Sequence, residues 1–184
     1  MTAYAGFVAT AIATWLDDTA TRTALLQNLV VNGTELNYVR PATHGYEMDE
    51  QVTKIIVLAS DETHGAGGTV SNTPWMGSAS INIIVSYIPV DVEGDVSMFE
   101  HAQRAFTILM ARLIHMLEEK RSFSYTEVGV GGMNINITGS PIRLTDYSMV
   151  SDVDEYITIF ASMISLEVEF GYAQINPMLM EEIS

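Results

Sequence analysis

The chain has 184 residues, the size of a single domain, and it contains no cysteine, which excludes a disulfide framework and a thiolate metal site. Its 23 acidic and 8 basic residues give a formal net charge of −15. Such a surface repels the phosphate backbone and argues against a sequence-reading DNA-binding protein. Only 17% of residues are charged and 48% are hydrophobic, whereas about 25% are charged in an ordinary domain. We therefore expect apolar surface to be buried against partner subunits.

The apolar stretch near the N-terminus does not have the properties of a membrane span. Residues 3–16 are interrupted by Thr10 and Thr14 and are fewer than the roughly 20 that a transmembrane helix needs. No Lys or Arg precedes the stretch, and Asp17 and Asp18 follow it directly. We interpret it as mature structure, neither a secretory signal nor a bilayer span.

Two helical segments are predicted at the start of the chain. Apolar residues recur every three or four positions over residues 4–16, the pattern of an amphipathic helix. Asp17, Asp18 or Thr19 can cap a second segment, which Asn-Gly at residues 32–33 is expected to stop.

The next part of the chain predicts strands around a long loop. Residues 35–41 favour a short strand, and residues 51–59 are rich in Ile and Val and favour a buried one. Residues 79–87 alternate apolar and mostly polar side chains, which is typical of a half-buried strand. The intervening residues 61–78 are predicted to be a Gly-rich loop because of their turn formers: Gly65, Gly67, Gly68, Asn72, Pro74 and Gly77.

A long central helix is the firmest prediction. Ser97 and Glu100 have the spacing of a capping box, and the apolar stripe that follows extends to about Ser122. Further strands are predicted at residues 133–137, after a glycine-rich turn, and over 156–170. The apolar phase of this last run changes, which predicts a bulge or break near Ile164.

No set of residues in the sequence has the spacing of a catalytic or cofactor site. There is no nucleophile elbow, phosphate-binding glycine loop or paired zinc ligands. His101 and His115 are 14 positions apart on the central helix, roughly 21 Å, too far to share a metal. Asp61, Glu62 and His64 offer metal-ligand types within four residues, but without a fuller ligand pattern. We predict no enzyme and no cofactor.

Exposed apolar residues indicate candidate subunit contacts. Trp75 and Met76 lie in the predicted loop and belong to residue types enriched in interfaces. Met178, Leu179 and Met180 make the C-terminal end unusually apolar, where polar fraying is common. These five residues are the predicted interface residues.

The order of elements resembles that of the tail terminator and tail-completion proteins of tailed bacteriophages. The features concerned are the end of the first helix at residues 16–18, the Gly-rich loop before Ala79, and the Ser97 helix between strand pairs. The resemblance implies a single α+β domain over residues 1–184, with a mixed, mostly antiparallel sheet against which the N-terminal and long central helices pack. It further implies a virion protein, assembled in the host cytoplasm, that forms a ring of six subunits. The ring would cap the tail tube, end its polymerisation and join it to the neck, and an acidic surface would suit the passage of DNA.

Three alternatives stay open at this stage. The chain could be another neck or tube subunit of the virion. It could instead bind a small ligand or metal through residues 61–77, in which case His64→Ala would abolish binding. A monomeric adaptor is the third alternative, and it predicts no self-association at micromolar concentration.

Overall fold

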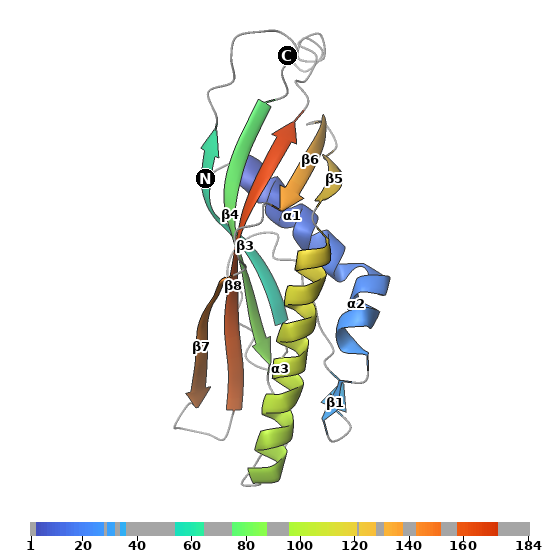
Figure 1. Ribbon diagram of the computed structural model, residues 1–184, viewed down its shortest axis with the longest axis vertical. Coiled ribbons are helices and arrows are strands. Elements are labelled where there is room, and N and C mark those ends of the chain that lie inside the picture. Colours follow the sequence, from blue (N-terminus) through green and yellow to red (C-terminus); the bar gives the residue numbers. More distant parts are fainter. Residues whose placement is uncertain are drawn as a thin grey trace, which may run out of the picture.

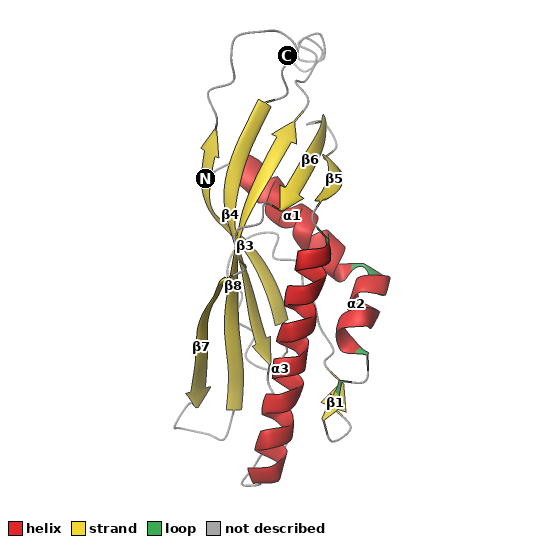
Figure 2. Cartoon of the chain, in the orientation of Figure 1, coloured by secondary structure: helices red, strands yellow, loops and turns green. Residues whose placement is uncertain are grey.

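The computed structural model describes residues 3–27, 29–31, 34–35, 54–64, 75–87, 96–120, 122–127, 131–137, 143–151 and 158–172. Within these ranges lie three helices and eight strands (Figures 1 and 2). The helices are α1 (Ala3–Asp17), α2 (Thr19–Leu26) and α3 (Val96–Glu119). The strands are β1 (Val30–Val31), β2 (Thr34–Glu35), β3 (Lys54–His64), β4 (Trp75–Tyr87), β5 (Ser122–Glu127), β6 (Gly131–Ile137), β7 (Arg143–Ser151) and β8 (Thr158–Tyr172). The predicted α+β class, with an N-terminal and a long central helix, is confirmed.

Six of the strands form one sheet in the order β3-β4-β8-β6-β5, with β7 also paired to β8. Every described ladder is antiparallel. One edge of the 15-residue strand β8 pairs with β4. Its other edge is shared, because β7 pairs with residues 158–165 and β6 with residues 168–172. The long central strand β8 therefore joins two halves of the sheet (Figure 1).

The helices cover one face of this sheet, which we call the inner face; the opposite side is the outer face. Figure 1 shows α1 crossing the upper half of the sheet and α3 lying beside the lower half. The ring of Phe106 on α3 stacks on Tyr87 of β4 and Phe160 of β8, with ring centroids 6.4 and 5.8 Å apart. In α1 the alanines Ala5, Ala9 and Ala13 are buried, and such small side chains let the helix approach the strands closely. One continuous core therefore lies between the helices and the inner face.

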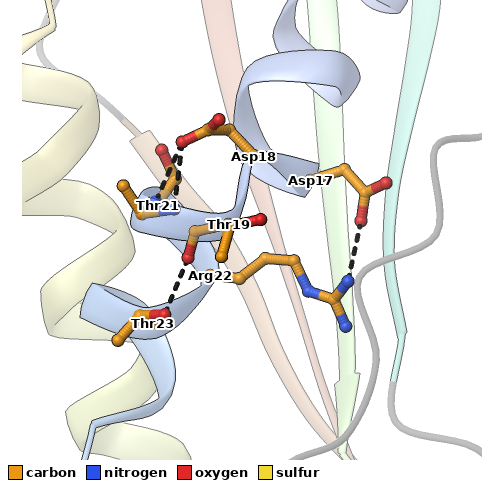
Figure 3. A network of polar contacts seen from close by, with 7 residues as sticks. Asp17, Asp18, Thr19, Thr21, Arg22 and Thr23 are labelled. Atoms are coloured by element: carbon orange, nitrogen blue, oxygen red, sulfur yellow. Dashed lines mark hydrogen bonds and ion pairs between the residues drawn. The ribbon is translucent and has the colours of Figure 1, made fainter.

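A polar network fixes the corner between α1 and α2 (Figure 3). The carboxylate of Asp18 accepts hydrogen bonds from the backbone N–H groups of Ala20 at 3.1 Å and Thr21 at 3.4 Å. It thereby satisfies donors that the first turn of a helix leaves free, so the predicted cap is confirmed at Asp18. Asp17 forms an ion pair with Arg22 at 3.5 Å beside it.

The C-terminal end of α2 is held by α3. Arg112 Nη1 donates to the carbonyl of Leu25 at 3.0 Å and to that of Gln27 at 2.6 Å. A cation at this position also complements the negative end of the helix dipole. The helix ends at Leu26, so the predicted stop at residues 32–33 is wrong. Those residues instead connect β1 to β2, in which Val31 pairs with Thr34, because Asn-Gly between β-branched residues favours a two-residue hairpin.

The loop predicted at residues 61–78 is wrong at both of its ends. Residues 61–64 belong to β3 and residues 75–78 to β4, whereas residues 65–74, with most of the turn formers, lie outside the described residues. Gly77 belongs to β4, and a side chain at this position is excluded because the ring of Phe170 fills the space beside its Cα.

Three further expectations need correction. Helix α3 begins at Val96, so Ser97 lies inside the helix and is not its N-cap. The helix ends at Glu119, and β5 begins at Ser122, where no strand was predicted; β7 was also missed. Strand β8 itself has no break near Ile164 and pairs with β4 without a register shift, whereas the irregularity opposite Ile164 lies in β7, between Leu144 and Asp146. Its even-numbered residues face inward throughout, including the buried Ser162, and Ala161 and Met163 belong to the outer face.

Of the strand predicted at residues 35–41, only Glu35 is described, and it lies in β2.

Candidate interface: the polar face of the sheet

The two faces of the upper half of the sheet differ sharply in chemistry. In β4 the inward residues Ala79, Ile81 and Ile83 are buried, while Ser78 and Ser80, which alternate with them, are more exposed. The same alternation in β8 buries Leu166, Val168 and Phe170 and exposes the acids between them. Because side chains of neighbouring strands in register share a face, the polar residues of several strands combine into one surface.

A β-bulge in β3 determines which of its residues join this surface. Ala59 pairs with Ile81, but Asp61 pairs with Ser80, so Ser60 is an extra residue. The Ser60 hydroxyl donates to the carbonyl of Ser80 at 3.1 Å. The bulge reverses the phase of the strand, so that Asp61 faces outward.

The same bulge turns Glu62 toward the core side of the sheet. Its carboxylate accepts a hydrogen bond from the backbone N–H of Ala5 at 2.9 Å, at the positive end of α1. Asp61 and Glu62 therefore serve opposite faces, and they do not converge as two ligands of one metal.

The outer face of the upper half forms straight rows across the strands. One row runs through Thr63, Ser78, Glu169, Asn136 and Ser122 over five strands. A parallel row contains Asp61, Ser80 and Glu167.

We call this surface the polar face and define it by Asp61, Thr63, Ser78, Ser80, Ser122, Ser124, Thr126, Asn134, Asn136, Glu167 and Glu169. It combines hydroxyls with three carboxylates, and the register adds the positions of Asn134 and Asn136. None of these defining positions is basic.

Two hydrogen bonds link side chains of neighbouring strands on this side of the sheet. The hydroxyls of Thr63 and Ser78 lie 2.7 Å apart. At the border of the face, Ser165 donates to Asn82 Oδ1 at 2.8 Å, and the register places Arg143 beside Ser165. The paired hydroxyls of Thr63 and Ser78 are short side chains with few rotamers, so this part of the face is hydrophilic and ordered.

Of the five predicted interface residues, Trp75 and Met76 lie within the described structure. Trp75 and Met76 open β4 and pair with Tyr172 and Gly171, so they are strand residues and not parts of a loop. Met178, Leu179 and Met180 lie outside the described residues.

The histidine and acid candidates are also separated. His101 and His115 are exposed on α3, where His115 Nε2 lies 3.3 Å from Glu119. Within the part of the chain that the structure describes, no group of three His, Cys, Asp or Glu side chains is placed to hold a metal ion.

Sequence reasoning missed the polar face, although a signal for it exists. Strands β4, β5, β6 and β8 each repeat one polar residue type two positions apart, as in Ser78 and Ser80 or Glu167 and Glu169. Such repeats predict a uniform outward face for one strand, but only the register shows that the strands share it.

Comparison with known proteins does not assign the chain to a family. No protein-family model and no curated protein matches it. None of the helices in the described ranges is both long and apolar enough to cross a membrane.

Proposed function

We propose that the chain is a structural virion protein that forms a ring, caps the tail tube of a tailed bacteriophage and joins it to the neck. The observation that carries this proposal is the polar face, a surface with exposed hydroxyls and carboxylates whose defining residues include no Lys or Arg. In the ring this face lines the channel through which DNA passes. A passage for DNA needs a surface that is wet but does not bind phosphate.

The chemistry of the face meets that requirement. Asp61, Glu167 and Glu169 are exposed on it and repel phosphate. None of the residues that define the face is Lys or Arg, and the nearest base by register, Arg143, lies at its border. The hydroxyls of Thr63 and Ser78 already bond to each other, which limits their adhesion to a passing strand. The result is a surface along which an anionic polymer slides.

The expected interfaces complete the proposal. Rings arise when a heterologous contact closes on itself, and the apolar excess of the chain supplies surface for such a contact. Trp75 and Met76, at the first positions of β4, together with Met178, Leu179 and Met180 near the C-terminus, remain the candidate contact residues.

The first test is the solution mass by light scattering, with negative-stain imaging of the same sample, alone and with purified tail tubes. A ring of six subunits has six times the mass of the 20.2 kDa chain. We expect closed rings, or rings at the ends of tubes whose length stops increasing. A monomer in both samples, with tube growth unchanged, contradicts the proposal.

A second test asks where the polar face lies in the ring. The chain has no cysteine, so Ser80→Cys introduces a unique thiol that a gold cluster can mark. We expect its density in the central channel, whereas the matched variant Thr107→Cys, at an exposed position of α3, marks another surface. Density of the Ser80 label on the outside of the ring would refute the channel assignment and leave the capping proposal standing.

Another neck or tube subunit is the nearest alternative, and the tube-length measurement separates the two, because only a cap stops polymerisation. The ligand-binding alternative loses support because residues 61–64 and 75–78 are strands. His64→Ala tests what remains of it.

A further inference from the structure

We draw no further inference here: the strongest candidate, the half-buried apolar patch that Leu58, Ile84 and Met163 form on the outer face of the lower half of the sheet, carries no proposal because nothing in the described part of the chain shows what covers it.

Discussion

The ring of Phe170 lies where any side chain at position 77 would begin. A Cβ added to Gly77 would be 2.6 Å from Phe170 Cζ and 3.0 Å from the carbonyl oxygen of Thr63. Phe170 cannot easily move, since it is 1% exposed and stacks on Tyr4 of α1 with ring centroids 6.1 Å apart. A glycine in β4 thus lets an aromatic ring of β8 support the first turn of α1.

Gly77→Ala should therefore destabilise the protein by about 1–3 kcal/mol, the usual cost of overpacking a core. Chemical denaturation measures the change. Gly6→Ala is the matched control: a Cβ there meets nothing within 4 Å, and Ala in an exposed helix position should raise stability by about 0.5–1 kcal/mol. Equal effects of the two substitutions would contradict this account of Gly77.

Asp18→Ala should lower the free energy of unfolding by about 1 kcal/mol, because the first N–H groups of α2 lose their acceptor. Asp17→Ala removes the neighbouring ion pair with Arg22, in which both side chains are 38% exposed. Loss of this ion pair should lower the free energy of unfolding by less than about 0.5 kcal/mol. Thermal unfolding of both variants at one pH separates the cap from the ion pair.

Arg112→Ala should lower the free energy of unfolding by about 1.5–3 kcal/mol. The substitution removes the charged donor that bonds to two backbone carbonyls at the end of α2. Hydrogen exchange should also show faster exchange in α2 than in α3. Arg104→Ala removes an exposed arginine two turns earlier on the same helix and should have little effect. A result in which both variants lose equal stability would rule out a specific role for Arg112.

Tyr87→Phe should keep the aromatic stack with Phe106 and Phe160 and raise stability by about 1 kcal/mol, because the buried Tyr87 hydroxyl has no hydrogen-bond partner among the described residues. Burial raises the pKa of Tyr87 above its ordinary value of about 10. Above that pH the unfolded chain loses a proton that the folded chain keeps, so stability falls as pH rises. The wild-type protein should lose stability faster than Tyr87→Phe in denaturation curves measured between pH 9 and 11. Parallel curves would show that Tyr87 does not titrate differently in the folded state.

Local patterns predicted the elements that depend on local chemistry. The stripe over residues 4–16 and the carboxylate of Asp18 act within a few residues, and both are found in the structure. The alternation over residues 79–87 likewise lies within β4. The predicted loop wrongly included Gly77. This glycine is required by the ring of Phe170, which lies 93 positions later in the chain, and it does not mark a turn. The prediction of which β8 residues face the core was wrong for the first half of the strand. Ala161 and Met163 lie on the outer face, but as apolar residues they resemble core residues in the sequence.

The candidate site was beyond sequence reasoning for a related physical reason. Asp61, Ser80 and Glu167 belong to three strands that only the sheet register brings together. The bulge at Ser60, which turns Asp61 outward, has no distinctive residue type. A composition that is acidic and poor in bases indicated the character of the surface, but not its place.

The position of β8 in the sheet also determines the order in which the molecule can fold. It is the last described strand of the chain, yet it lies between β4 and the pair β6 and β7. Until residues 158–172 arrive, the apolar sides of β4 and α3 have no complete cover, and distant pairings of this kind form slowly. Intermediates of a nascent chain therefore expose apolar surface until β8 inserts, and the six-stranded sheet is complete only after residues 158–172 have been synthesised.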